Sequence, residues 1–184
     1  TIAQTGLTEK EAIDLDIDID VLHNVKPNRP EYMQGQEMVI KAIFDKNNSK
    51  LLGAQIIGYE GVDKRIDVLA TAITFGAHAE DLFHLDLAYA PPFSTTKDPV
   101  IYTGMIGHNI TRGRKIITPE EVIKQNNDLL ILDVRSPKQF EVNHVDGEIN
   151  VPLKILRSYA KTLDKNQKIE IFTLPVTSKK HSSY

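Results

Sequence analysis

The stretch that decides the fold is residues 37–58, EMVIKAIFDKNNSKLLGAQIIG, followed closely by residues 62–76, VDKRIDVLATAITFG. The first stretch holds two apolar, partly β-branched runs, and the polar segment 46–49 joins them. The two asparagines of this segment tolerate left-handed backbone, so we predict a β-hairpin. In the second stretch, apolar residues recur at intervals of three and four, which predicts an amphipathic helix.

Shorter elements are expected on both sides of this pair. Thr8 and Glu11 form a capping box, and apolar residues alternate with acids over residues 16–21. Adjacent prolines make residues 89–93 a rigid, extended connection, and Asp98 before a proline is a favourable helix start. The predicted elements are a helix from Thr8 to about Leu15, a strand over 17–21, a helix over 79–85 and a helix from Asp98 to about Asn109.

The chain is expected to hold two domains, residues 1–111 and 117–184, with a linker over 112–116. Residues 1–112 carry 10 Lys and Arg against 16 Asp and Glu, whereas residues 113–184 carry 12 against 9. This change from acidic to basic is typical of two independently built units. In the second domain we predict a helix starting at Thr118 and strands over 129–134, 149–151 and 168–172, the α/β pattern. From residue 173 onward we predict disorder or contacts borrowed from a neighbouring chain.

Composition narrows the classes of function. With 41% hydrophobic and 26% charged residues, the 184-residue chain is typical of a soluble globular protein, for which we expect a cytoplasmic location. A net charge of −3 argues against a nucleic-acid partner, and no apolar run approaches the roughly 20 residues of a membrane-spanning helix. The six histidines lack metal-ligand spacing, so no metal site is predicted. The chain does not begin with Met, which suggests a fragment.

Residues 60–69, EGVDKRIDVL, and 88–99, AYAPPFSTTKDP, resemble the C-terminal dimerisation domain of pyridine nucleotide-disulfide oxidoreductases. The closest resemblance is to the coenzyme A-disulfide reductase and NADH oxidase branch, and it covers about residues 1–110. It implies an α+β domain, an antiparallel sheet flanked by helices, which forms a homodimer and completes the partner's active site. FAD, NAD(P)H and coenzyme A are implied for the full-length family. No G-x-G-x-x-G turn for a dinucleotide occurs in this chain.

The resemblance implies catalytic roles for Tyr32 and Tyr89, near coenzyme A and the reactive cysteine of the partner. A phenol can donate a hydrogen bond to a thiol or thiolate leaving group. Alternatively, Tyr89 anchors the proline turn and Tyr32 covers a strand end. The adjacent Pro92 and Phe93 are further candidates for the ligand site, although Phe93 replaces a tyrosine of some family members and brings no hydroxyl.

Lys64 and Arg65 stand where a helix opens, a place where cations oppose the helix dipole. Binding a phosphate of coenzyme A would explain this placement. Surface pairing with Glu60 or Asp67 would explain it as well.

Residues 130–153 resemble the first half of a rhodanese domain, which implies a partial α/β domain. In that fold Asp133 and Arg135 hold loops through charge-assisted hydrogen bonds, and His144 is structural rather than a base. Thr173 occupies the position of the catalytic cysteine, and the chain contains no cysteine at all. A hydroxyl cannot form a persulfide, so the rhodanese-like domain is predicted to be truncated and inactive.

Three hypotheses of function follow. The first is a C-terminal fragment of a coenzyme A-disulfide reductase-like flavoprotein, which dimerises and completes the partner's site but is inactive alone. The second is one subunit of an active split oxidoreductase, working with a separate FAD- and NAD(P)H-binding chain. The third, a rhodanese-type sulfurtransferase, is disfavoured because the chain has no cysteine.

Overall fold

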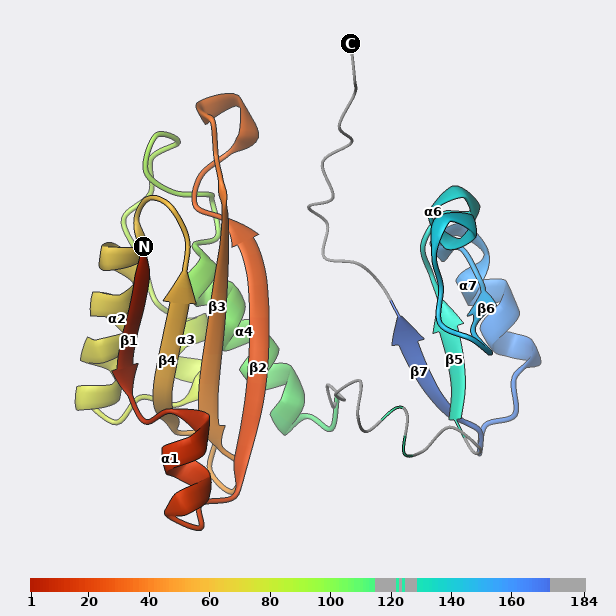
Figure 1. The fold of residues 1–184 in the computed structure, drawn as a ribbon, viewed down its shortest axis with the longest axis horizontal. Coiled ribbons are helices and arrows are strands. Elements are labelled where there is room, and N and C mark those ends of the chain that lie inside the picture. Colours follow the sequence, from red (N-terminus) through yellow and green to blue (C-terminus); the bar gives the residue numbers. More distant parts are fainter. Residues whose placement is uncertain (115–121, 123, 125–128, 173–184) are drawn as a thin grey trace. The chain divides into compact units, whose positions relative to one another are not determined.

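The computed structural model describes residues 1–114, 122, 124 and 129–172. The chain divides into two compact units, Thr1–Ile116 and Ile117–Tyr184, each of which is described by itself (Figure 1).

The first unit is built on an antiparallel sheet of four strands in the order β1-β4-β3-β2. The predicted hairpin is confirmed as β3 and β4, but the left-handed residue in its turn is Ser49 (φ 63°) rather than an asparagine. The strand predicted over 17–21 starts later and is longer, and the edge strand β1 was not predicted. The bounds are β1 Ile2–Gly6, β2 Ile19–Pro27, β3 Glu37–Asp45 and β4 Leu51–Ile57.

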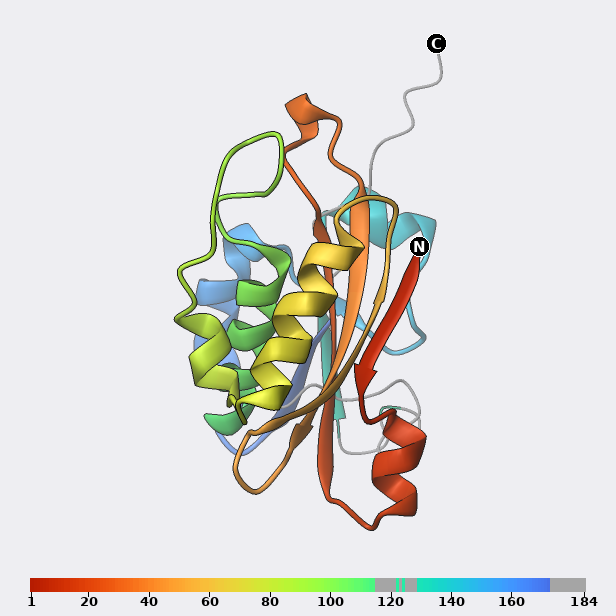
Figure 2. The same cartoon turned by 90° about the vertical axis from the view of Figure 1, so that its left-hand side faces the viewer.

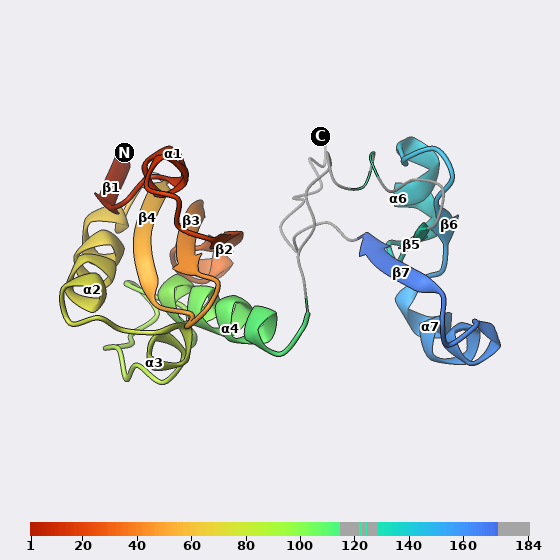
Figure 3. The ribbon, with the colours of Figure 1, turned by 90° about the horizontal axis from the view of Figure 1, so that it is seen from below.

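Three helices, α2, α3 and α4, cover one face of this sheet, and α1 lies on its other side (Figure 3). The capping box predicted at Thr8 is confirmed, and so is the helix start at Asp98, whose carboxylate accepts from the Val100 N–H. Both helices therefore begin where their side chains satisfy free backbone donors. The bounds are α1 Glu9–Asp14, the 3-10 turn η1 Glu31–Met33, α2 Val62–Thr74, α3 Ala79–Phe83 and α4 Pro99–Thr111.

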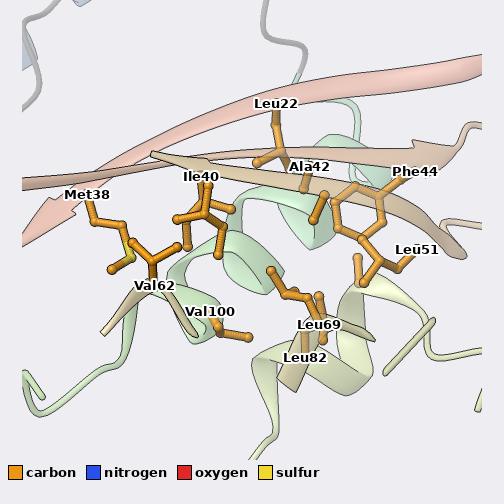
Figure 4. Packing of buried hydrophobic residues seen from close by; sticks show 13 residues of the cluster. Leu22, Met38, Ile40, Ala42, Phe44, Leu51, Val62, Leu69, Leu82 and Val100 are labelled. Carbon is orange, nitrogen blue, oxygen red and sulfur yellow. The ribbon is translucent and has the colours of Figure 1, made fainter. Parts of the chain in front are cut away.

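The core of the first unit lies between the sheet and these three helices (Figure 4). Alternate residues of the strands and the inner stripe of α2 point into it, because the two periodicities place those side chains on one face. The core side chains labelled in the view are Leu22, Met38, Ile40, Ala42, Phe44, Leu51, Val62, Leu69, Leu82 and Val100, each 2% exposed or less.

The second unit contains a parallel sheet of three strands in the order β6-β5-β7. All three strands were predicted, whereas the short helices α6 and α7 were not. The helix predicted from Thr118 and the tail from residue 173 lie outside the described residues. The bounds are β5 Leu129–Asp133, α6 Pro137–Val142, β6 Ile149–Asn150, α7 Leu153–Tyr159, the 3-10 turn η2 Ala160–Thr162 and β7 Lys168–Phe172.

Candidate functional site

Three connections of the first unit meet beyond the same end of the sheet. They are the β2–β3 loop (residues 28–36), the β4–α2 turn (58–61) and the α3–α4 loop (84–98). Figures 1 and 2 show the first and third of them extending past the strand ends together. Every site residue predicted from the sequence lies on these loops or on the first turns of α2.

Arg65 stands at the centre of the three connections, and only 2% of it is exposed. Its side chain turns back toward the start of α2, where Nη1 donates to the Gly61 carbonyl at 3.1 Å. Its Nε and Nη2 contact the carboxylate of Asp98 at 3.1 and 2.9 Å. The surface pairing of Arg65 with Glu60 or Asp67 that the sequence suggested is wrong, because the partner is the buried Asp98 from the far side of the α3–α4 loop.

The same guanidinium also binds both loops through their backbone. Nη2 donates to the Asn28 carbonyl at 3.0 Å and to the Phe93 carbonyl at 3.3 Å, and it approaches Ser94 Oγ at 3.4 Å. Ser94 in turn donates to Asp98 at 2.8 Å. The four polar residues Asn28, Arg65, Ser94 and Asp98 are each 4% exposed or less, whereas Phe93 is 71% exposed.

Asn28 extends this network, which we call the Arg65 cluster: Asn28, Arg65, Ser94 and Asp98. Its amide donates to the Glu60 carbonyl at 3.1 Å and its Oδ1 accepts from the Gln36 N–H at 2.8 Å. The β2–β3 loop is thus closed at its base and joined to the β4–α2 turn. Since buried polar groups must be paired, this cluster fixes the backbone of all three connections.

The Arg65 cluster requires a glycine at position 61. Its φ is +72°, and a Cβ there would lie 2.2 Å from Arg65 Nη1. A side chain at this turn would therefore displace the guanidinium as well as strain the backbone.

The aromatic candidates are exposed to solvent, unlike the residues of the Arg65 cluster. Tyr32 is 74% exposed, Phe93 is 71% exposed and Tyr89 is 49% exposed. Tyr32 lies in the η1 turn of the β2–β3 loop, and the other two lie with Pro92 in the α3–α4 loop. The fold therefore presents exposed rings on two loops that share one buried anchor.

The two cations expected at the start of α2 have different surroundings. Lys64 donates weakly to the Ala88 carbonyl, at 3.5 Å, so it lies beside the segment that carries Tyr89. Arg65 is an internal group whose donors are committed to protein acceptors, which argues against direct contact with a phosphate. A third cation, Arg29, was not singled out from the sequence; it pairs with Glu60 at 2.7 Å and reaches the Pro92 carbonyl at 3.5 Å.

Residues 1–99 match the model of the pyridine nucleotide-disulphide oxidoreductase dimerisation domain. The chain belongs to this family. Its antiparallel sheet with flanking helices is the fold that the resemblance implied, and that prediction is confirmed for the first unit.

Relatives within the family include enzymes of coenzyme A and sulfur chemistry. Over 101 residues the chain is 41% identical to the CoA-dependent NAD(P)H sulfur oxidoreductase of Pyrococcus furiosus, covering 54% of this chain and 23% of that protein. Over 105 residues it is 33% identical to the coenzyme A disulfide reductase of Staphylococcus epidermidis, covering 56% and 24%.

Solved structures are similar over a longer part of the chain. Reduced CoADR-RHD of Bacillus anthracis has a TM-score of 0.82 and 36% identity, covering 92% of this chain and 31% of that one. The NAD-dependent persulfide reductase of A. fulgidus has a TM-score of 0.72 and 32% identity over the same shares. The matched part of the chain thus covers 23% and 24% of the two curated relatives and 31% of each of the two solved chains.

Two glycines of the described residues cannot form a cradle for a dinucleotide. Such a cradle needs glycines whose bare backbone faces the pyrophosphate. Gly53 and Gly35 face the chain itself: a Cβ on Gly53 would lie 1.8 Å from the Leu7 carbonyl oxygen, and one on Gly35 would lie 1.9 Å from that of Arg29. The backbone of these two glycines is therefore closed to a pyrophosphate.

The second unit holds a buried ion pair of its own. Arg135 Nε donates to Asp133 at 2.7 Å, and Nη2 donates to the Asn143 carbonyl at 2.8 Å. Burial alone would raise the pKa of Asp133, but the hydrogen bonds and charge of Arg135 outweigh it and the pKa is lowered. His144 stacks on Phe140 with ring centroids 4.1 Å apart. These contacts hold the loops around β5, the scaffold role that the sequence suggested for Asp133 and Arg135.

Within the described residues, three or more potential metal-ligating side chains are nowhere grouped as a metal ion would require. In the same residues, no helix has the length and apolar character needed to cross a membrane.

Proposed function

We propose that this chain is the C-terminal part of a coenzyme A-disulfide reductase-like flavoprotein oxidoreductase. Its first unit forms a homodimer and completes the active site of the partner subunit, and the chain is inactive alone. The observation that carries this proposal is the pair of aromatic loops held at one end of the sheet by the Arg65 cluster, in a chain of this family.

Tyr32 and Tyr89 are the proposed catalytic groups. Each phenol can donate a hydrogen bond to a thiolate as a disulfide bond is reduced, and each presents a flat apolar face to the pantetheine arm of coenzyme A. Their exposure of 74% and 49% leaves them free for a ligand or a partner. Phe93, at 71% exposed, and Pro92 supply apolar contact beside them.

Lys64 is the proposed contact for a phosphate of coenzyme A. Its ammonium group has only a long hydrogen bond of 3.5 Å to the Ala88 carbonyl, so a phosphate oxygen would be a stronger acceptor. The same lysine lies next to the segment that carries Tyr89, which supports a shared ligand for the charge and the phenol.

We propose that the second unit is a rhodanese-like domain and that this chain has no sulfurtransferase activity of its own. Its parallel strands and the Asp133–Arg135 pair support this assignment, and the lack of any cysteine removes the persulfide-forming group. A cytoplasmic location remains a prediction from composition.

The first test is the oligomeric state. Sedimentation equilibrium of the purified chain is expected to give a dimer of the 20.7 kDa polypeptide. A monomer that persists at high protein concentration would contradict the dimerisation role.

The second test is reconstitution. The remaining part of the Staphylococcus epidermidis coenzyme A disulfide reductase, without its own dimerisation domain, is mixed with this chain. Oxidation of NAD(P)H that depends on coenzyme A disulfide is expected only in the mixture, and Tyr89→Phe is expected to lower kcat. Turnover by this chain alone, in the absence of any flavoprotein, would overturn the proposal. A separately encoded flavoprotein that co-purifies with the chain would instead favour the split oxidoreductase.

A further inference from the structure

A single nitrogen atom joins the two loops of the candidate site. Arg65 Nη2 donates to the Asn28 carbonyl at 3.0 Å and to the Phe93 carbonyl at 3.3 Å. The first carbonyl begins the loop that carries Tyr32, and the second belongs to the loop that carries Tyr89. The relative position of the loops therefore depends on where this guanidinium lies.

The chemistry of the site suits an arginine and no other cation. A guanidinium is planar and has donors in fixed directions, which here point to Asp98, Gly61 and the two loop carbonyls at once. A lysine ammonium is a single point with three donors, and it could not reach this spread of acceptors. Because Arg65 is 2% exposed, bulk water has little access to take over the lost hydrogen bonds.

The other links between the two loops are weaker. Arg29 reaches the Pro92 carbonyl only at 3.5 Å, and its side chain is 24% exposed. Asn28 binds the β4–α2 turn through the Glu60 carbonyl, and it closes its own loop through Gln36. Arg65 is thus the strongest group that contacts both loops directly.

We propose that Arg65 is a positioning residue that locks the Tyr32 loop and the Tyr89–Phe93 loop into one preformed surface before any partner or ligand binds. The use of that surface, as a site for a ligand and the partner subunit, rests on the proposed function. A preformed surface loses less conformational entropy on binding, which is the advantage of holding two exposed aromatic loops on one buried anchor.

The test is amide hydrogen exchange of the whole 184-residue chain, comparing the wild type with Arg65→Lys. The loop reporters are the N–H groups of Asn28 and Gln36, which bond across the base of the first loop, and those of Phe93 and Ser94, which bond to the Ala90 carbonyl. Arg65→Lys is expected to lower the protection of these loop amides, and any change in the amides of β3 and β4 serves as the reference. The extra loss in both loops is expected to be roughly tenfold or more, which is the factor for losing one hydrogen bond to a charged group.

Leu69→Ala is the matched control. Leu69 lies one turn further along α2, is fully buried in the core and is outside the cluster. Its loss destabilises the fold, so protection is expected to fall in the strands without a selective loss in the two loops. If Arg65→Lys gave the same uniform pattern as this control, or affected only one loop, the positioning role would be wrong.

Chemical rescue separates positioning from general support of the fold. In Arg65→Ala, millimolar guanidinium chloride is expected to restore protection in both loops, whereas sodium chloride at the same ionic strength is not. Folded Arg65→Ala whose loops respond equally to both salts would overturn the inference. Neither measurement needs a dimer or turnover, so a failure of the proposed function in sedimentation or reconstitution is distinguishable from a failure here.

Discussion

Replacing Asp98 with Asn tests how strongly the buried ion pair stabilises the first unit. Asp98 is 3% exposed and accepts from Arg65, from Ser94 at 2.8 Å and from the Val100 N–H at 3.0 Å. Asn is as good a helix cap as Asp, so Asp98→Asn keeps the start of α4 and removes only the charge. The Arg65 guanidinium is then buried without a counter-ion, for which we expect a loss of about 3–5 kcal/mol.

Asp98→Ala removes the cap as well and is expected to cost about 1 kcal/mol more than Asp98→Asn. Both losses are large beside the roughly 5–15 kcal/mol by which a typical domain is stable. The assay is urea unfolding followed by far-ultraviolet circular dichroism, with the transition of the first unit assigned through exchange of β3 amides.

A double-mutant cycle measures the interaction free energy between Arg65 and Asp98. Arg65→Met combined with Asp98→Asn leaves no buried charge, so the double variant is expected to lose less stability than the sum of the single changes, by about 0.5–3 kcal/mol. A cost for Asp98→Asn below about 1 kcal/mol, the value of an exposed ion pair, would refute the reasoning. Strict additivity in the cycle would refute it as well.

Two further predictions concern a backbone turn and a pH dependence. Gly61→Ala is expected to destabilise the first unit by about 1–3 kcal/mol, because φ is +72° and the new Cβ would lie 2.2 Å from Arg65 Nη1. Gly113→Ala is the control in thermal melts, since φ is +80° there but nothing lies within 4 Å of the added Cβ; equal losses would show that the contact with the guanidinium does not matter. In the second unit, the pKa of Asp133 is lowered in the folded state, with burial opposed and outweighed by Arg135. Its stabilising contribution is therefore present above the unfolded value of about 3.9 and is lost as the pH falls through the lower folded pKa. Unfolding of residues 129–172, measured from pH 6 downward, should show this loss of stability, and Arg135→Met should abolish it. A pH profile unchanged by that variant would contradict the pairing.

The candidate site was only partly predictable. The motifs around Lys64 and Tyr89 led to the family, and the family implied roles for the exposed aromatic residues. Nothing in the local sequence indicated that Arg65 is buried, because a charged residue on the first turns of a helix is ordinarily solvated. Asn28 and Ser94 belong to no recognisable motif, and only the folded structure shows that both contact the Arg65 guanidinium.

The elements with local signals could be predicted from the amino-acid sequence. Apolar runs on both sides of a polar turn specify the β3–β4 hairpin, spacing of three and four specifies α2, and Asp98 before Pro99 specifies the start of α4. The edge strand β1 was not predicted, and its pairing with β4 defines it. The short helix α7 was not predicted either, and none of its residues is buried.

The pairing of Arg65 with Asp98, and the link that Arg65 makes between the two aromatic loops, follow from the folded arrangement of the chain. These groups are separated by 33 residues along the chain, and neither periodicity nor capping relates them. They meet because the sheet and its helices bring three connections to the same end. A buried charge is stable there only beside a counter-ion, and a guanidinium has enough donors to bind all three connections.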